Sequence, residues 1–141
     1  MRLPEQRFWD RTRARLQAEF RLERIENLAG VGTPDVLATA RETGRTTLIE
    51  LKAVVELPKR ATSKVLGRAG LSQDQKNWHM DFVRARGTAF ILVGIGPCRQ
   101  LLIEGRWADH INDWNFTELN VHAVAFDWLD IKNVLTNEKP Q

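Results

Sequence analysis

The fold is indicated most clearly by one stretch of the chain, Thr46-Thr47-Leu48-Ile49-Glu50-Leu51-Lys52-Ala53-Val54-Val55. It is apolar on both faces apart from two charges, which is typical of a central strand covered on both sides. Because side chains alternate along a strand, Glu50 and Lys52 point to the same, largely apolar face. Burying an acid and a base there costs several kcal/mol unless they are paired or bind a metal. The two charges therefore indicate either a functional site or a buried ion pair.

A second strand is predicted just before this one. Residues 30–34 are a cluster of helix and strand breakers, and the β-compatible run 35–40 ends at the turn signal Glu42-Thr43-Gly44-Arg45. This pattern predicts a hairpin, which can place the carboxylate of Asp35 near that of Glu50. Two carboxylates repel one another, and a hard cation such as Mg²⁺ relieves that repulsion. With a lysine beside it, such a set suits phosphodiester hydrolysis. The alternative for Asp35 is a turn residue after Pro34.

The remaining elements follow from hydrophobic spacing and breaker residues. A helix is predicted over residues 4–20, because Glu5, Phe8, Trp9, Thr12, Leu16 and Phe20 share one stripe at helical spacing. Residues 21–27 either extend this helix or form a strand, and we take the strand as the prediction. Further elements are strands at 89–95 and 99–103, and a helix at 127–136. The predicted order is αβββαββ followed mostly by helix, with a mixed central sheet flanked by helices. We expect one domain over 1–136 and a loose tail over 137–141.

A further helix is predicted to begin after Ser72. Gln75 lies three residues later, as a capping box requires, and Gly87 is placed where a C-terminal cap is expected. Trp78, Phe82 and Ala85 are predicted to form its buried stripe.

Composition bounds the class of protein. The chain has 141 residues, 43% of them hydrophobic and 28% charged, as in a single globular domain. No run approaches the ~18 to 20 apolar residues of a membrane span, and the charged start does not resemble a secretory signal. One cysteine, Cys98, and three scattered histidines indicate neither a disulfide nor a structural zinc site. We therefore expect a reducing cytosol, in a prokaryotic or virus-infected cell.

Charge is distributed unevenly along the chain. The net charge is +3, but residues 1–68 hold 14 Lys and Arg against 9 Asp and Glu, whereas 69–141 hold 7 against 9. The region from Leu57 to Gly70 carries four cations and no acid, which indicates an exposed basic loop. Such a loop is either an ordinary solvated surface or, beside a phosphodiesterase site, a contact to a nucleic-acid backbone.

These residues carry a family resemblance. Pro34-Asp35, fourteen intervening residues and Glu50-Leu51-Lys52 resemble the signature of the PD-(D/E)xK nuclease superfamily. The contexts Gly32-Thr33-Pro34-Asp35-Val36 and Leu71-Ser72-Gln73-Asp74-Gln75 are similar to those of its small VRR-NUC and Holliday-junction-resolvase-like members. The resemblance spans roughly residues 5–95, and it implies an α/β fold with a restriction-endonuclease-like core.

The resemblance also implies roles for particular residues. Asp35 and Glu50 match the metal ligands, the Leu51 carbonyl is a third, and Lys52 matches the catalytic lysine. Gln75 matches a glutamine beside the active site, although it can equally be only the partner of Ser72 in the capping box. A glutamate from the first helix often completes such sites, and both Glu5 and Glu19 lie on the predicted stripe. We take Glu5 as the candidate, and the alternative is an ordinary acid in the first turn of a helix, which the helix dipole favours. The expected cofactor is Mg²⁺, with Mn²⁺ as a substitute. The candidate DNA-binding residues are Lys59, Arg60, Lys64, Arg68 and Lys76.

The function expected from this resemblance is metal-dependent DNA endonuclease activity. No base-reading module is evident, so recognition of DNA shape is favoured over recognition of sequence, and branched DNA such as a Holliday junction is the favoured substrate. Symmetric cutting of a junction by so small an enzyme requires a pair, which predicts a C₂ homodimer. The alternatives are a nuclease acting on flaps, ends or a short sequence site, and a binding module of the same fold that hydrolyses nothing.

Overall fold

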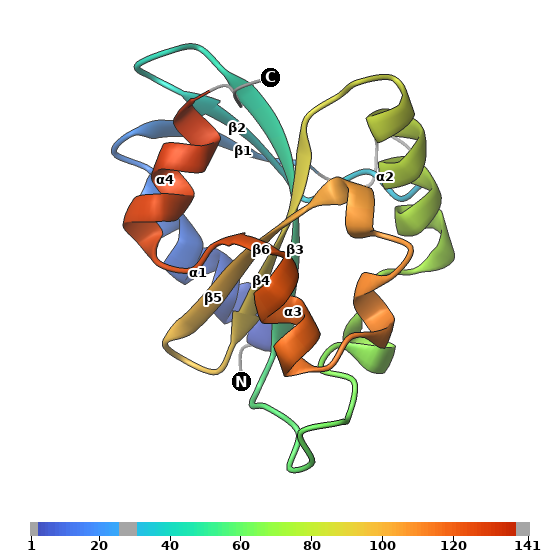
Figure 1. Ribbon diagram of the computed structural model, residues 1–141. Helices are drawn as coiled ribbons and strands as arrows, with labels where there is room; N and C mark the ends of the chain where they lie inside the picture. Colours follow the sequence, from blue (N-terminus) through green and yellow to red (C-terminus); the bar gives the residue numbers. More distant parts are fainter. Residues whose placement is uncertain (1–2, 26–30, 138–141) are drawn as a thin grey trace.

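The computed structural model describes residues 3–25 and 31–137, and it builds them around a six-stranded sheet. The helices are α1 (Pro4–Leu16), α2 (Gln73–Arg84), α3 (Phe116–His122) and α4 (Trp128–Thr136), with short 3₁₀ turns η2 (Gly67–Ala69), η3 (Gly105–Trp107) and η4 (Ile111–Asp113). The strands are β1 (Phe20–Arg24), β2 (Val36–Ala40), β3 (Thr46–Val54), β4 (Ala89–Ile95), β5 (Arg99–Glu104) and β6 (Ala123–Ala125). Figure 1 shows α1 and α4 on one side of the sheet, with α2 and α3 on the other.

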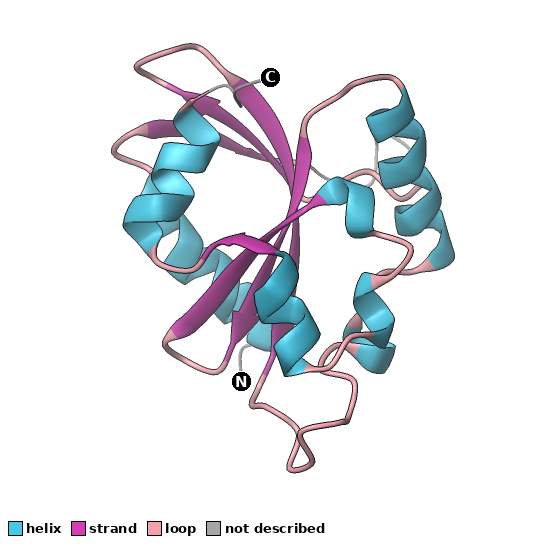
Figure 2. Ribbon diagram, in the orientation of Figure 1, coloured by secondary structure: helices cyan, strands magenta, loops and turns pink. Residues whose placement is uncertain are grey.

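The sheet is mixed, as predicted. Its spatial order is β1-β2-β3-β4-β5-β6, and each pair is antiparallel except β3 with β4, which run parallel across the connection through α2. The sheet lies between helices on its two sides (Figure 2). Two apolar cores pack against its two faces. Ile49 and Leu51 of β3 face the core under α1 and α4, whereas Ile91 and Val93 of β4 face the other. Strand β3 is thus covered on both sides, which explains its nearly continuous apolar sequence.

The first helix is shorter than predicted. It ends at Leu16, and Phe20 is the first residue of β1, paired with Ala40 and buried. Phe20 fits the helical stripe, but it reaches the core from a strand after a short turn. Glu19, which the stripe also included, is exposed and forms an ion pair with Lys132 at 3.3 Å. The predicted strand near 21–27 is Phe20–Arg24, and residues 26 and 27 lie outside the described residues.

Helix α2 begins as predicted, with Ser72 as its N-cap and a complete capping box. The predicted buried stripe is wrong, because the buried residue of this helix is His79, while Ala85 is exposed. Trp78 and Phe82 are half-buried and stack on one another with ring centroids 4.5 Å apart.

The C-terminal cap of α2 is displaced by one residue from the prediction. The left-handed position is Arg86, with φ 66°, and Gly87 follows it. A Cβ at Gly87 would lie 2.4 Å from the ring of Phe82, so glycine is needed there for close packing.

The region after residue 104 differs from the predicted run of helices. Two 3₁₀ turns and α3 lead into β6, an edge strand whose pairing with β5 contains an irregularity. A strand of three residues shows no alternation, so the sequence carried no signal for it. The final helix forms as predicted, with Asp127 as its N-cap. Of the predicted tail 137–141, only Asn137 is described, and its carbonyl accepts a hydrogen bond from Arg45.

The position of α1 is set by its close approach to the sheet. A Cβ on Gly94 of β4 would lie 2.5 Å from the ring of Phe8, so the absent side chain makes room for that ring. Phe8 is buried, and Glu5 lies about one helical turn before it. Within residues 3–25 and 31–137, no helix has both the length and the apolar character needed to cross a membrane.

Candidate active site

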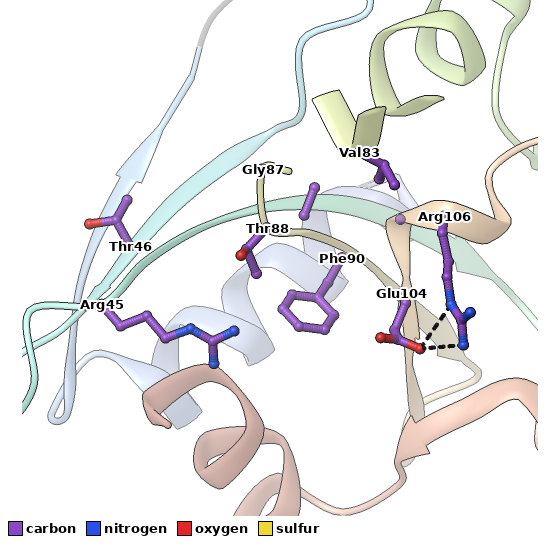
Figure 3. Close-up of a pocket in the computed structure, with 10 residues that line it drawn as sticks. Arg45, Thr46, Val83, Gly87, Thr88, Phe90, Glu104 and Arg106 are labelled. Atoms are coloured by element: carbon purple, nitrogen blue, oxygen red, sulfur yellow. Dashed lines mark hydrogen bonds and ion pairs between the residues drawn. The ribbon is translucent and has the colours of Figure 1, made fainter. Parts of the chain in front are cut away.

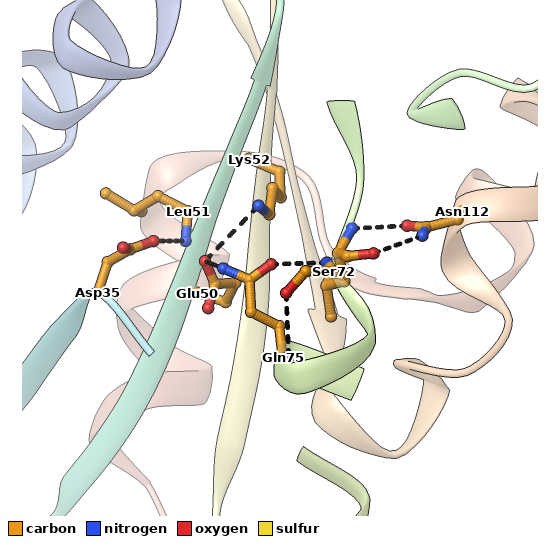
Figure 4. Close-up of polar contacts among 8 residues, drawn as sticks. Asp35, Glu50, Leu51, Lys52, Ser72, Gln75 and Asn112 are labelled. Carbon is orange, nitrogen blue, oxygen red and sulfur yellow. Dashed lines mark hydrogen bonds and ion pairs between the residues drawn. The ribbon is translucent and has the colours of Figure 1, made fainter. Parts of the chain in front are cut away.

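Asp35 lies just before β2, at the point where the β2–β3 pairing ends. The last paired residues are Val36 and Ile49. Beyond this pair, a side-chain oxygen replaces a backbone carbonyl of the neighbouring strand as the hydrogen-bond acceptor. The Oδ2 of Asp35 accepts a hydrogen bond from the Leu51 backbone N–H at 2.9 Å (Figure 4). The hydrogen bond fixes the carboxylate of Asp35 beside the middle of β3.

Pro34 explains why the pairing ends here. Continuing the register would place Pro34 opposite Leu51, and proline has no N–H to donate to the ladder. In a strand the N–H and C=O of one residue point to the same neighbour, so the Leu51 carbonyl faces this gap in the ladder together with its N–H. The N–H is bound by Asp35, and the carbonyl is left without a ladder donor from Pro34. This position suits the ligand role predicted for the Leu51 carbonyl.

Glu50 is fully buried in the centre of β3, on the face covered by α2. Its Oε2 accepts a hydrogen bond from the Gln75 side-chain amide at 3.2 Å and lies 3.9 Å from the Lys52 Nζ. Its other oxygen, Oε1, is buried and has no hydrogen-bond partner in the described part of the chain. A buried carboxylate oxygen without a donor is costly, and a cation is one group that removes that cost.

Glu5 completes a group of three carboxylates. One ligand oxygen each from Glu5, Asp35 and Glu50 lies within 4.8 Å of the others. The three come from α1, the segment before β2, and β3, so only the tertiary fold assembles them. Glu19 is not part of this group, because it lies beyond the end of α1 and is paired with Lys132.

The electrostatics of the group reflect burial and crowding. Burial raises the pKa of Glu50, and the neighbouring Asp35 raises it further, while Lys52 acts in the opposite direction. Burial also raises the pKa of Glu5, again followed by the effect of Asp35. With one lysine among three carboxylates, the cluster has excess negative charge when ionised and favours either a proton or a cation.

The donor set fits a hard divalent cation. Carboxylate and backbone carbonyl oxygens are the ligands that Mg²⁺ prefers in proteins, and one or two carboxylates plus water commonly suffice. The Oε1 of Glu50 has no hydrogen-bond partner among the described residues, and the Leu51 carbonyl faces the gap in the ladder opposite Pro34. We therefore assign Glu5, Asp35, Glu50 and the Leu51 carbonyl as the candidate ligands.

Gln75 combines the two roles that the sequence left as alternatives. Its Oε1 accepts a hydrogen bond from the Ser72 N–H at 2.9 Å, which completes the capping box. Its Nε2 donates to Glu50, as described above. A single amide thus ties the first turn of α2 to the candidate ligand, because its carbonyl and its NH₂ group point in different directions.

This double role predicts different effects for two cap substitutions. Ser72→Ala and Gln75→Ala should each lower the free energy of unfolding by about 1 kcal/mol, because each removes half of the capping box. Only Gln75→Ala removes the donor to Glu50, so only it should also weaken metal binding and any metal-dependent activity. Thermal unfolding with and without Mg²⁺ separates the two effects. Equal loss of the Mg²⁺ response in both variants would show that the cap, and not the contact to Glu50, is what matters.

Gly32 fixes the segment that carries Asp35 against α2. It has φ +82°, and a Cβ there would lie 2.3 Å from the backbone oxygen of Asp74 in the first turn of α2. Pro34 is buried next to it. The sequence motif contains this glycine, but nothing in the sequence identifies the backbone that it contacts.

The predicted DNA-binding residues lie on the loop after β3 and on α2. Lys59, Arg60, Lys64 and Arg68 are exposed on the loop that projects from the body after β3, and Lys76 is half-buried on α2 (Figure 1). Lys64 forms an exposed ion pair with Asp113 at 2.9 Å, and this contact lowers the pKa of Asp113.

The loop is anchored at its C-terminal end by a residue that sequence reasoning missed. The side-chain amide of Asn112 in η4 accepts a hydrogen bond from the Leu71 N–H and donates one to the Leu71 carbonyl, each at 2.8 Å (Figure 4). Val65 adds a backbone bond to Trp114 at 3.0 Å. A lone asparagine far along the chain carries no sequence signal for such a contact.

A separate pocket of about 590 Å³ lies at the start of β3 and β4, away from the carboxylates (Figure 3). Its two arginines are engaged, since Arg45 donates to the carbonyl of Val134 and Arg106 pairs with Glu104 at 3.2 Å. It contains no member of the carboxylate group. The chemistry of the carboxylates, and not the size of this pocket, therefore defines the candidate site.

Comparison with known proteins supports the fold. No family model matches the chain, and no curated protein matches it. Among solved structures, the chain is similar to Hjc from Archaeoglobus fulgidus, a Holliday junction resolvase from an archaeal hyperthermophile. The TM-score is 0.50 at 21% identity, over 72% of this chain and 77% of the resolvase. The predicted fold class, α/β with a restriction-endonuclease-like core, is thereby confirmed.

Proposed function

We propose that this protein is a divalent-metal-dependent DNA endonuclease that hydrolyses phosphodiester bonds. The observation that carries the proposal is the convergence of Glu5, Asp35 and Glu50 within 4.8 Å, with Lys52 beside them. Its fold, similar to that of an archaeal Holliday junction resolvase, supports the same activity.

The residues divide the work of hydrolysis between them. Glu5, Asp35, Glu50 and the Leu51 carbonyl would hold Mg²⁺, which when bound would supply Lewis-acid stabilisation of charge on a phosphate oxygen. Mn²⁺ accepts the same oxygen ligands and should substitute. A water attacks phosphorus in line and releases one proton to solvent, the bond between phosphorus and the leaving oxygen breaks, and the leaving oxygen takes up a proton from solvent.

Lys52 and Gln75 orient the groups that take part. The side chain of Lys52 is only 12% exposed, so its ammonium is held near Glu50 and can donate to the attacking water or to a phosphate oxygen. Gln75 holds Oε2 of Glu50 through its amide, and Oε1, which has no hydrogen-bond partner among the described residues, would be the oxygen that ligates the cation. In this arrangement Lys52 is a catalytic residue and Gln75 is a positioning residue.

The expected substrate is branched DNA, recognised by shape. The exposed cations Lys59, Arg60 and Arg68 suit backbone contacts, which carry no sequence information. We propose that two copies form a C₂ dimer on a four-way junction, since one copy presents one site. Light scattering with and without junction DNA measures the stoichiometry.

The test of the proposed function is cleavage of labelled four-way, flap and linear DNA of equal sequence, with and without Mg²⁺ or Mn²⁺. Wild-type protein should cut only with metal, while Lys52→Ala and Asp35→Asn should bind DNA without cutting it. Glu5→Gln tests the third carboxylate of the group. Its matched control is Glu19→Gln, because Glu19 lies outside the carboxylate group and pairs with Lys132. Tight binding with no cutting under any condition would instead establish a non-catalytic binding module. The preferred substrate distinguishes a junction nuclease from one acting on flaps, ends or a sequence site.

The basic loop should contribute affinity without specificity. Replacing Lys59 and Arg60 by alanine should weaken binding to all DNA forms alike. The slope of log K against log salt should fall by about one for each phosphate that the variant no longer neutralises. Arg84→Ala is the control, since Arg84 lies at the far end of α2 from Gln75. Titrations at several salt concentrations measure the slope, and an unchanged slope would exclude the loop from the interface.

A further inference from the structure

A second pocket, of about 310 Å³, lies between the start of α1 and the ends of β3 and β4. Its walls are mostly apolar and include Phe8, Ala53, Val54, Val55 and Pro97. A volume near 300 Å³ is at the small end of ligand pockets, enough for one nucleoside and too small for a duplex.

Two arginines of α1 border this pocket. The Nη2 of Arg11 donates to the Gly96 carbonyl at 3.1 Å, while its Nε is buried without a partner among the described residues. Arg7 is exposed, and no ion pair joins it to any residue in 3–25 or 31–137. Guanidinium groups bind phosphate oxygens bidentately. Because Arg11 is bonded to Gly96 and lies 5.0 Å from the centroid of the Phe8 ring, Arg7 is the candidate phosphate-binding group of this pocket.

The apolar rim is unusually open to solvent. Val55 is 65% exposed, although it follows directly on the buried strand β3 and lines the pocket. Base stacking on apolar and aromatic groups is tolerant of sequence, and it covers surface of this kind.

Two residues that line the pocket are chain neighbours of candidate site residues. Pro4 precedes Glu5, and Ala53 follows Lys52. Asp35 precedes β2, which pairs with β3 on one side, whereas Gly96 and Pro97 follow β4, which pairs with β3 on the other side. Consecutive Cα atoms are about 3.8 Å apart, so the pocket wall begins one residue from Glu5 and one residue from Lys52.

We propose that this pocket receives one unstacked nucleobase from the strand that is cut, with Arg7 on an adjoining phosphate. The proposal rests on the proposed nuclease function and deepens it. Extruding a base from a duplex costs a few kcal/mol, and least where the base is already unpaired. A base-binding pocket thus favours DNA with unpaired or weakly stacked bases, as at a branch point or flap.

Binding measured in a chelator tests the pocket separately from cleavage. Val55→Trp fills the pocket from an exposed position, and it should weaken binding to flap and branched DNA by about tenfold while changing duplex binding less than about twofold. Arg7→Ala should weaken binding by about fivefold or more, whereas Arg13→Ala, exposed on the same helix outside the pocket, should change it less than about twofold. If Arg7→Ala and Arg13→Ala lowered the affinity for DNA equally, the effect would come from the loss of positive charge alone, and the proposal would be overturned.

An abasic residue moved along the strand locates the bound base. Wild-type protein should lose affinity at one or two positions only, and Val55→Trp should remove that position dependence. A uniform profile, or unchanged branched-DNA binding by Val55→Trp, would refute the proposal that the pocket binds a base.

Melting temperatures with and without Mg²⁺ verify that each variant is folded with its carboxylates intact. If wild-type protein binds in this pattern but cuts nothing, the nuclease proposal fails while the pocket stands. If wild-type protein cuts DNA and Val55→Trp leaves DNA binding unchanged, only the proposal for the pocket fails.

Discussion

Glu50→Gln should reduce metal-dependent cleavage by about 10³-fold or more, equivalent to about 4 kcal/mol of transition-state stabilisation. The substitution keeps the shape of the side chain and its contact with Gln75, but it removes the charge that holds the cation. DNA binding should persist, because the exposed cations of the basic loop are unchanged. Single-turnover cleavage at saturating protein measures the reduction.

The same substitution should stabilise the metal-free protein at neutral pH. Burial raises the pKa of Glu50 above its ordinary value of 4.5. The folded state therefore retains a proton that the unfolded state releases as the pH rises above 4.5, so wild-type stability falls with increasing pH. Glutamine carries no such penalty. Glu50→Gln should gain about 1 kcal/mol or more at pH 7, a rise of about 2 to 8 °C in melting temperature.

Thermal unfolding between pH 5 and 9, with and without Mg²⁺, tests both parts. Mg²⁺ should raise the melting temperature of wild-type protein by preferential binding to the folded state, and it should have little effect on Glu50→Gln. Glu42→Gln, in the exposed turn before β3, is the control for loss of one negative charge. A Glu50→Gln variant that is less stable than wild type at pH 8 without metal would show that the buried ion pair with Lys52 outweighs the burial cost.

Gly32→Ala should damage both stability and activity. An alanine there must adopt φ +82°, and its Cβ would lie 2.3 Å from the backbone oxygen of Asp74, which cannot rotate away. The free energy of unfolding should fall by about 2 to 4 kcal/mol. Relief of the clash moves the segment that carries Asp35, and a shift of about 1 Å in a catalytic group can cost about 100-fold in rate.

Gly44→Ala separates the two components of this effect. Gly44 also has positive φ, +76°, but among the described residues, its two chain neighbours aside, no heavy atom lies within 4 Å of the Cβ that would be added. It should cost about 1 to 2 kcal/mol from the backbone conformation alone and leave cleavage unchanged. Chemical unfolding and cleavage assays at a temperature where both variants are folded measure the difference. Equal cleavage by the two variants would show that the contact with Asp74 does not position Asp35.

Much of the fold followed from local patterns. The alternation and apolar content of residues 46–55, the breaker cluster before Asp35 and the capping box at Ser72 each report on structure within one segment. Those segments formed as predicted. The end of the first helix did not, because Phe20 satisfies helical spacing and strand burial equally well, and only its pairing with Ala40 separates the two.

Local sequence was enough to show which charges are out of place. Glu50 and Lys52 lie in an apolar strand, and that anomaly is visible within ten residues. The groups that join them depend on tertiary packing. That packing selects Glu5 over Glu19, since α1 ends at Leu16 and the contact of Phe8 with Gly94 brings its first turn to the sheet. It also sets Pro34 opposite Leu51 and brings Gln75 to both of its partners. These outcomes depend on how separate elements pack, and the spacing of residues along one segment does not encode that packing.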